Sequence, residues 1–301
     1  NIFTCGRPAG RPQVKMFEIK LSQGAKPGKG GILPAEKVDA EIAEIRGIKV
    51  GEASISPNRH RDINSADELL DMIVRIREVT GKPVGFKTVM GSFDWLEQLC
   101  GKIKLRGVEC APDFITVDSG DGGTGAAPMP LIDNVGLLVR EALPLTVNVL
   151  AEHDLKERIK VVASGKFITP AEVAWGLCAG ADFIVTARGA MFSLGCIQAM
   201  KCNKNTCPTG ITTHDRRLQR GLVPKEKSKR VANYIRNLVS EVDVIANSCG
   251  VLEPRGLRRY HVRMMQNTCI TIPLIDLYPW PEGKAPGKAE YPTAKRKSQA
   301  A

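Results

Sequence analysis

Asp113-Phe114-Ile115-Thr116-Val117 runs directly into Asp118-Ser119-Gly120-Asp121-Gly122-Gly123-Thr124-Gly125. The first five residues predict a buried strand, because they are mostly apolar or β-branched. The loop that follows has four glycines within residues 120–125, so its backbone can adopt positive φ angles and approach a ligand closely. A flat cofactor or a phosphate would fit such a loop, although glycine loops are common and this one alone is not specific.

Strands and helices alternate on both sides of this stretch. We expect strands at residues 14–21, 54–56, 83–90, 113–117, 159–165 and 182–187. We expect helices at residues 35–46, 66–79, 93–106, 130–142, 170–179, 191–200, 225–247 and 253–266. This alternation, with β-branched strands, predicts the parallel sheet of an α/β protein.

Residues of functional type follow several predicted strands, at 23–26, 119–125, 165–166 and 188–189. A (β/α)8 barrel, or TIM barrel, places its active site at the carboxyl ends of its strands. An open doubly wound sheet does the same, but the chain lacks the GxGxxG helix start of a Rossmann domain. We therefore expect a (β/α)8 barrel. Only about six strands are convincing, so we also expect the first strands of a closed barrel to lie upstream of Asn1.

Composition excludes several classes of protein. Of the 301 residues, 43% are apolar and 25% are charged, so most of the chain is expected to fold. No stretch approaches the roughly 20 apolar residues that a membrane-spanning helix needs. The first ten residues lack the apolar centre of a signal peptide, and we expect a cytoplasmic protein.

The formal net charge of +11 is partly a property of the tail, because a net four of these charges lie between Lys284 and Ala301. The remaining basic residues are spread along the chain, and only 5% of residues are aromatic. A solvated surface with a basic tail explains this pattern better than nucleic-acid binding. We therefore expect no nucleic-acid partner.

Lysines gather in a loop after the first predicted strand, Lys20-Leu21-Ser22-Gln23-Gly24-Ala25-Lys26-Pro27-Gly28-Lys29-Gly30-Gly31. Three lysines and a glutamine in one pocket would bind a carboxylate or a phosphate. An exposed turn with solvated lysines is the simpler alternative. Two later turns, at Gly165 and Gly189, each end a predicted strand and would bind a phosphate through backbone N–H groups.

Three of the nine cysteines are crowded together, Cys196, Cys202 and Cys207, in the pattern C-x5-C-x4-C-P. Three thiolates this close can bind a soft metal centre. Zinc would normally need a fourth ligand, for which His214 is the nearest candidate. Three ligands without a fourth fit a [3Fe-4S] cluster, and three buried free thiols are the alternative. No Ser-His-Asp arrangement or metal-binding pair of histidines stands out.

These motifs together resemble those of the FMN-binding synthase domain of glutamate synthase, particularly its shorter, stand-alone members. The resemblance covers roughly residues 12–255, and its most specific motifs are the cysteine segment and the lysine loop. The matching residues are 20–31 with Leu33-Pro34, Ile55-Ser56-Pro57, Gly85-Phe86-Lys87, 119–125, and the continuous stretch 194–211 from Leu194-Gly195-Cys196 through Cys207-Pro208-Thr209-Gly210-Ile211.

The resemblance implies a (β/α)8 barrel with FMN over its carboxyl-terminal mouth and a [3Fe-4S] cluster that passes electrons to the flavin. It implies that reduced FMN gives a hydride to 2-iminoglutarate, formed from 2-oxoglutarate and ammonia, so that L-glutamate results. It also implies an electron donor, such as ferredoxin or a reductase subunit, and ammonia from solution or from a separate glutaminase source. The resemblance leaves the oligomeric state open, and a homo-oligomer is one of the alternatives.

Carried over by position, the resemblance assigns roles to individual residues. The carboxylates of 2-oxoglutarate would meet Lys20, Gln23, Lys26 and Arg46. Lys87 would be the catalytic cation near the flavin pyrimidine, where it stabilises the anionic reduced flavin. The other FMN ligands would be Ser119, Gly120, Asp121, Gly165, Lys166, Arg188 and Gly189, and the cluster ligands would be Cys196, Cys202 and Cys207.

We expect two parts in the chain. Residues 1–266 would form an FMN-binding barrel domain, incomplete at its N-terminus, with the iron–sulfur loop at 196–207, and residues 267–301 an irregular, proline-rich basic tail. Ala163-Ser164-Gly165 stands where many members of the family have Asp-Gly-Gly. Two alternatives stay open: an FMN barrel that acts on another oxo or hydroxy acid, and an inactive electron-transfer or binding subunit.

Overall fold

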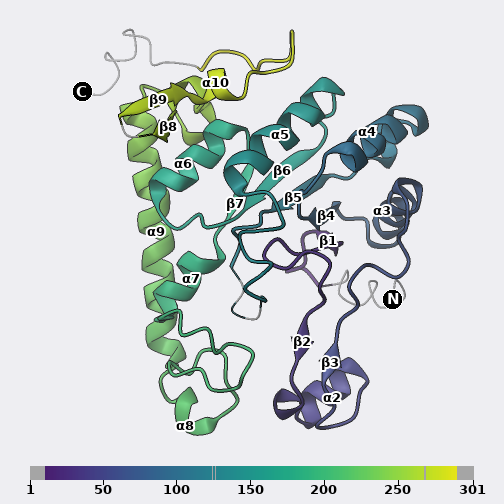
Figure 1. The fold of residues 1–301 in the computed structure, drawn as a ribbon, viewed down its shortest axis with the longest axis vertical. Helices are drawn as coiled ribbons and strands as arrows, with labels where there is room; N and C mark the ends of the chain where they lie inside the picture. The colour runs from purple at the N-terminus through teal and green to yellow at the C-terminus, as the bar shows by residue number, and fades with distance from the viewer. Residues whose placement is uncertain (1–10, 124, 126, 268, 290–301) are drawn as a thin grey trace.

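A sheet of five parallel strands forms the centre of the protein (Figure 1). The computed structural model describes residues 11–123, 125, 127–267 and 269–289. The strands lie in the order β1-β4-β5-β6-β7, and each neighbouring pair is parallel. Their bounds are β1 (Phe17–Lys20), β4 (Val84–Thr88), β5 (Phe114–Asp118), β6 (Lys160–Ser164) and β7 (Phe183–Val185). The predicted parallel α/β architecture is confirmed, and five of the six expected strands belong to this sheet.

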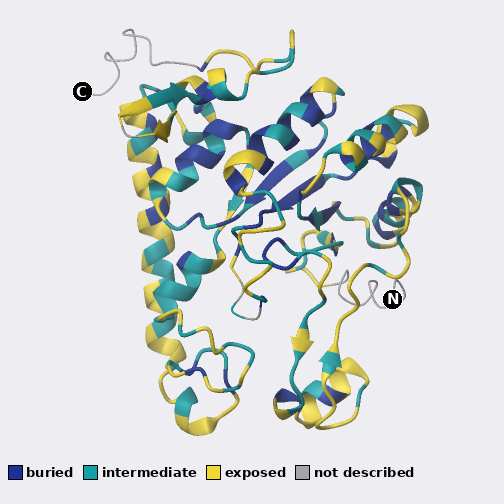
Figure 2. Ribbon diagram, viewed as in Figure 1, coloured by how far each residue is buried: buried dark blue, intermediate teal, exposed yellow. Residues whose placement is uncertain are grey.

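Helices connect successive strands of the sheet and cover one of its faces (Figure 1). Alternate residues of the strands point toward these helices, and Phe86, Ile115 and Val161 are fully buried there. Figure 2 shows the buried residues gathered on the strands and on the inner faces of the helices. The helices are α3 (Ala66–Thr80), α4 (Asp94–Arg106), α5 (Val139–Glu152), α6 (Pro170–Ala179), α7 (Ala187–Leu194) and α9 (Pro224–Ser248), which packs against α6 and α7.

Local sequence signals define the ends of the helices that were predicted best. Ser65 accepts a hydrogen bond from the Glu68 N–H at the start of α3, and Gly81 ends that helix in the left-handed conformation. Helix α6 begins with a capping box between Thr169 and Glu172 and ends at Gly180. The predicted helices 66–79 and 170–179 are therefore confirmed within one residue.

An arm extends from the sheet between β1 and α3 (Figure 1). Its two short strands, β2 (Ile32–Leu33) and β3 (Ser54–Ile55), pair antiparallel. Between them lie the 3-10 turn η1 (Ala35–Lys37) and helix α2 (Ala40–Arg46). The single helix expected over 35–46 is instead divided into η1 and α2, because Asp39 caps a new helix. The strand expected at 54–56 forms as β3, but it pairs with β2 rather than with the parallel sheet.

Two further helix predictions need correction, and one helix was not predicted. The helix expected at 130–142 begins only at Val139, because Gly120 and Asp133 share a backbone hydrogen bond that holds the preceding residues in turns. The helix expected at 191–200 starts directly after β7 and ends at Gly195, which is left-handed. A short helix, α8 (Arg216–Gln219), follows the cysteine segment.

The C-terminal region also differs from its prediction. Instead of a helix at 253–266, the chain forms the 3-10 turns η3 (Pro254–Gly256) and η4 (Arg259–His261) and then a hairpin. The hairpin consists of β8 (Arg263–Asn267) and β9 (Ile270–Pro273), and α10 (Leu274–Leu277) follows it. Asn267 and residues 270–277 thus belong to regular elements, although an irregular tail was expected from residue 267. No helix in the described ranges is long and apolar enough to cross a membrane.

Candidate functional site

The loops at the carboxyl ends of the parallel strands are joined by Asp118, the last residue of β5. Its Oδ2 accepts a hydrogen bond from the Gly24 N–H at 2.9 Å, and its Oδ1 accepts one from Ser164 Oγ at 2.9 Å. The loops after β1, β5 and β6 are therefore fixed to one another. Sequence reasoning gave Asp118 no role, because neither partner is near it in the chain.

A basic cavity of about 330 Å³ opens at this edge of the sheet. Its walls are residues 20–31, after β1, and residues 56–62, after β3. The predicted substrate residues Lys20, Gln23 and Lys26 all line it, and Lys20 Nζ donates to Gln23 Oε1 at 3.1 Å. Among the residues that the structure describes, none of its five Lys and Arg side chains forms an ion pair: Lys20, Lys26, Lys29, Arg59 and Arg61.

Lys26 is the most deeply placed of these cations, with 6% of its surface exposed. Its burial lowers its pKa below the ordinary value, and the neighbouring charges of Lys20 and Lys29 lower the pKa further. A carboxylate in the cavity would reverse this effect, because an opposite charge favours the protonated amine. The site is therefore suited to an anion that neutralises several cations together.

Arg46 lies apart from the other predicted substrate residues. It belongs to the last turn of α2 on the arm, and its Nη1 donates to Ser54 Oγ at 3.2 Å. It does not belong to the residues that line the basic cavity, whereas Arg59 and Arg61 do. Sequence reasoning did not single out these two arginines, because only the pairing of β2 with β3 brings residues 56–62 next to the lysine loop.

Lys87 lies on β4 beside the basic cavity. It is the register partner of Lys20, so the two side chains share one face of the sheet. Its Nζ forms an ion pair with Glu18 Oε1 at 3.0 Å, and Glu18 Oε2 accepts a hydrogen bond from Thr116 Oγ1 at 2.6 Å. About a quarter of the Lys87 side chain is exposed, so it is accessible on the open face of the sheet.

The glycine loop after β5 is packed closely against its neighbours. Ser119 is fully buried, and its hydroxyl donates to Asp121 and to the Ser164 carbonyl. A Cβ on Gly120 would lie 2.1 Å from the Gly136 carbonyl oxygen, and one on Gly165 would lie 1.9 Å from Ser119 Oγ. The protein's own atoms therefore explain these glycines through packing.

The remaining predicted FMN ligands surround this loop. Lys166 forms an ion pair with Asp133 at 3.1 Å and lines a cavity of about 140 Å³ with Asp121 and Gly165. This volume is smaller than the roughly 300–1,000 Å³ of most ligand pockets. Arg188, in the first turn of α7, lies against Gly123, where a Cβ would be 2.4 Å from Arg188 Nε.

Gly189 follows Arg188 in α7, which begins immediately after β7. A Cβ there would lie 1.8 Å from Tyr234 Oη, so packing on α9 requires this glycine. The N-terminus of α7 leaves backbone N–H groups without partners inside the helix, which is the arrangement that binds phosphates. Position and donor chemistry fit a flavin phosphate here.

The three crowded cysteines lie on the segment after α7. Among the described residues, no group of three or more His, Cys, Asp and Glu side chains is close enough to hold a metal ion, so the three thiols do not meet. Cys202 lies against the glycine loop, because a Cβ on Gly125 would be 2.3 Å from its Sγ. Burial alone would raise the pKa of Cys207, but hydrogen bonds from Thr209 and Thr212 outweigh it and lower the pKa to about 6. The donor chemistry fits a thiolate-bound cluster, and the spacing of the thiols in this structure does not.

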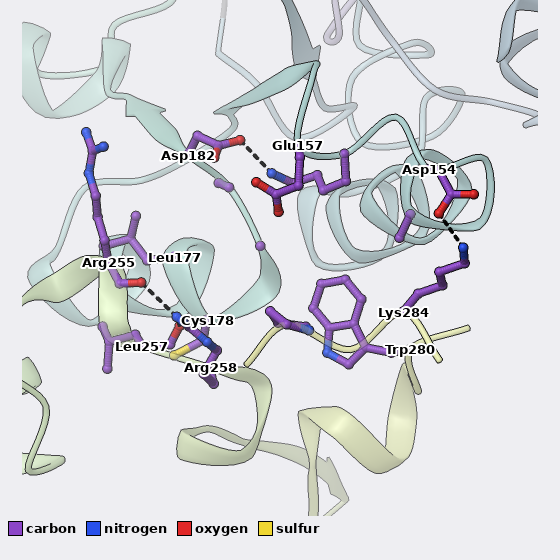
Figure 3. A pocket seen from close by; sticks show the side chains of 15 residues that line it. Asp154, Glu157, Leu177, Cys178, Asp182, Arg255, Leu257, Arg258, Trp280 and Lys284 are labelled. Atoms are coloured by element: carbon purple, nitrogen blue, oxygen red, sulfur yellow. Dashed lines mark hydrogen bonds and ion pairs between the residues drawn. The ribbon is translucent and has the colours of Figure 1, made fainter. Parts of the chain in front are cut away.

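A second cavity, of about 380 Å³, opens at the opposite edge of the sheet, before β6 and β7 (Figure 3). Its charges are largely paired: Lys156 Nζ contacts Asp182 Oδ2 at 2.8 Å, and Lys284 is paired with Asp154. Arg258 donates to the backbone carbonyl of Arg255 at 2.8 Å. Sequence reasoning did not predict this cavity, and its internal pairing leaves little charge for a ligand.

The fold and the loops therefore define a parallel α/β protein with a cationic site at the carboxyl ends of its strands. Residues 12–252 match the model of the family described as the conserved region in glutamate synthase. This chain belongs to that family.

Individual relatives agree with the family match. The chain is 42% identical over 250 residues to the glutamate synthase large subunit-like protein YerD of Bacillus subtilis, covering 83% of this chain and 47% of that protein. It is 35% identical over 243 residues to an archaeal-type glutamate synthase (NADPH) of Thermotoga maritima, covering 80% and 47%. It is also similar to a solved flavocytochrome b2 variant with pyruvate bound, at a TM-score of 0.46 and 12% identity over 94% of this chain and 56% of that chain. The chain spans about half the length of the curated relatives it matches.

Proposed function

We propose that this chain supplies the substrate site and part of the flavin site of a glutamate synthase-type oxidoreductase. The reaction is the reduction of 2-iminoglutarate, formed from 2-oxoglutarate and ammonia, to L-glutamate. The observation that carries the proposal is the basic cavity, where Lys20, Gln23 and Lys26 gather beside Lys87. Family membership supports it, because relatives bear the name glutamate synthase.

The cavity binds the substrate through its two carboxylates. Lys26 and Lys20 neutralise one carboxylate, with Gln23 as an additional donor, and Arg59 or Arg61 on the opposite wall meets the other. Charge-assisted hydrogen bonds of this kind orient the substrate as well as bind it. The reacting carbon is thereby held next to the face of the sheet that carries Lys87.

FMN, when bound, supplies the hydride. Lys87 contributes a positive charge at the open face of the sheet, held in place by Glu18. Ser119, Gly120 and Asp121 form the edge of the ring site, while Gly165, Lys166, Arg188 and Gly189 hold the phosphate at the start of α7.

Cys196, Cys202 and Cys207 would supply the thiolate ligands of a [3Fe-4S] cluster. The contact of Cys202 with Gly125 supports this assignment, because it brings the cysteine segment against the glycine loop of the flavin site. The lowered pKa of Cys207 also supports it, because thiolates are the ligands of iron. Electrons come from a separate donor, ferredoxin or an NADPH-dependent reductase, and the names of relatives include both kinds.

The test uses the full-length protein, reduced anaerobically, with flavin absorbance as the readout. 2-Oxoglutarate with ammonia should reoxidise the flavin, and neither compound alone should do so. Lys87→Met should lose this reaction, while Lys102→Met, which removes an exposed lysine of α4, should retain it. Reoxidation by 2-oxoglutarate alone, or none with both compounds, would contradict the proposal.

Iron content tests the cluster separately. Cys207→Ser should lose iron and sulfide. Cys178→Ser should keep both, because burial raises the pKa of Cys178 to about 12 and the thiol is not a metal ligand. Equal iron in the two variants would refute the cluster assignment.

One observation favours a second candidate, an FMN barrel acting on another oxo or hydroxy acid. Arg46 does not line the cavity, so the full set of dicarboxylate-binding residues is not assembled. The same reoxidation assay with a panel of monocarboxylic oxo acids separates the two candidates. Flavin that no acid reoxidises would instead indicate an inactive electron-transfer or binding subunit.

A further inference from the structure

Lys37 is a buried lysine whose partners lie far away in the sequence. It ends η1 on the arm, and only 7% of its surface is exposed. Its Nζ donates to the carbonyl of Cys202 at 2.7 Å and to the carbonyl of Thr212 at 2.5 Å. Since a buried ammonium group is costly unless it is hydrogen-bonded, these two carbonyls fix where the lysine lies.

Both carbonyls belong to one closed segment, residues 202–213, which we call the cysteine loop. Thr213 Oγ1 donates to the Asn205 carbonyl at 2.6 Å, and Asn205 Oδ1 accepts a hydrogen bond from the His214 N–H at 2.7 Å. These bonds close the part of the cysteine loop between Asn205 and Thr213. Lys37 holds the loop at both ends and joins it to the arm.

The base of the same arm forms the basic cavity. Residues 28–31 of the cavity wall lead into β2, and residues 56–62 follow β3. The two walls are joined where the Ser56 N–H donates to the Gly31 carbonyl at 2.8 Å, and the Gly30 N–H donates to Asn58 Oδ1 at 3.2 Å. One short element therefore connects the cavity at its base with the cysteine loop near its tip.

We propose that Lys37 is a positioning residue that holds the cysteine loop in place and couples it to the basic cavity. A dicarboxylate that bridges the two walls fixes the base of the arm. Because Lys37 joins the arm to residues 202–213, the bound ligand also restrains the motion of that loop. By linkage, a fixed cysteine loop also favours binding in the cavity. Only the identity of the ligand rests on the function proposed above; the hold of Lys37 on the loop does not.

The test is hydrogen–deuterium exchange of the full-length protein without ligand. Lys37→Met removes both hydrogen bonds while keeping an apolar stem of similar length. Exchange over residues 202–213 should become faster by about tenfold or more, since bonds to charged groups are the stronger ones. Lys49→Met is the matched control, because Lys49 is an exposed lysine of the same arm, and it should change nothing there. Equal exchange in the two variants would overturn the proposal.

A chemical measurement on the unmutated protein covers the case in which Lys37→Met does not fold. An amine-acylating reagent followed by mass spectrometry should leave Lys37 largely unmodified under conditions that modify Lys49. Acylation of both lysines at the same rate in the native protein would show that Lys37 is not held, and would overturn the proposal.

Added 2-oxoglutarate tests the coupling. In the wild type it should slow exchange at the cavity walls and also over 202–213, and in Lys37→Met it should slow exchange at the walls alone. Slowing confined to the walls in the wild type, or equal slowing of the loop in both proteins, would contradict the coupling. If no wall residue responds, the proposed substrate is wrong, and the ligand-free comparison still decides the role of Lys37.

Discussion

The cavities at the two ends of the parallel strands have similar numbers of charged side chains, but these charges differ in how far they form ion pairs. At the carboxyl ends, the cations of the basic cavity form no ion pairs among the described residues, and Lys26 is nevertheless buried. At the opposite ends, Asp182 and Asp154 are each joined to a lysine (Figure 3). Two carboxylates of the larger cavity thus pair with lysines, while the smaller cavity has five cations that form no ion pair in the described part of the chain and one carboxylate, Asp62. The uncompensated charge, rather than the size of the cavity, indicates the ligand site.

The comparison is tested most strongly at Lys26. Lys26→Met should weaken 2-oxoglutarate binding by roughly 10- to 100-fold, because a charge-assisted bond to a carboxylate is lost. It should not lower the melting temperature, since it removes a cation that lies near two others. Isothermal titration calorimetry measures the first effect and thermal denaturation the second. Lys284→Met, in the other cavity, is the control and should bind 2-oxoglutarate normally.

The pH dependence of binding should follow the same lysine. Because the pKa of Lys26 is lowered in the folded protein, its burial costs stability at neutral pH, and this cost is relieved as the pH rises between the lowered value and the ordinary one. Affinity for a carboxylate should fall as the pH rises above the lowered pKa of the free protein, by up to about tenfold per pH unit, because the complex keeps Lys26 protonated. Binding titrations with 2-oxoglutarate at several alkaline pH values should show this fall of affinity in the wild type. Lys26→Met should lack the part of the fall that Lys26 causes. A flat profile in the wild type would remove Lys26 from the site.

The second cavity should respond in stability instead of binding. Asp182 Oδ2 accepts hydrogen bonds from Lys156 and from the Val161 N–H, both at 2.8 Å. Asp182→Asn should lower the free energy of unfolding by about 2 kcal/mol, because a half-buried charged acceptor is lost. Denaturant titration measures this, and 2-oxoglutarate affinity should stay unchanged. Weaker binding in this variant would place the ligand in the second cavity and contradict its proposed place in the basic cavity.

The exposed ion pair of the second cavity should give the smallest effect. Two thirds of the Asp154 side chain is exposed, so solvent screens its contact with Lys284. Lys284→Gln should therefore leave both melting temperature and 2-oxoglutarate affinity within experimental error. A large loss of either would show that this end of the molecule is more than structural.

The strands of the sheet were predictable because their signal is local. Residues 113–117 and 159–165 are β-branched apolar runs, and the structure has β5 and β6 there. Strand β8 was mistaken for part of a helix because Met264 and Met265 suit a helix equally well. Only contacts distant in sequence decide between them: Met264 Sδ accepts a hydrogen bond from Trp175 Nε1 at 3.1 Å. The buried Arg259, which donates to the carbonyls of Pro144 and Tyr278, was missed for the same reason.

The site was predictable to a similar degree. Lys20, Gln23 and Lys26 were found together because one loop carries all three. Arg59, Arg61 and Lys37 were not found, because their placement depends on the arm and on segments remote in sequence. Arg46 remains a predicted substrate residue whose side chain this structure places on the arm, bonded to Ser54.

The most direct measurement tests whether the basic cavity is the substrate site. Lysines of the full-length protein are acylated with and without 2-oxoglutarate, and mass spectrometry measures the modification of each. The ligand should protect Lys20 and Lys29, which line the basic cavity, and should leave Lys156 and Lys284 at the opposite edge as reactive as before. Protection of Lys156 and Lys284 instead, or equal protection at both edges, would contradict this account.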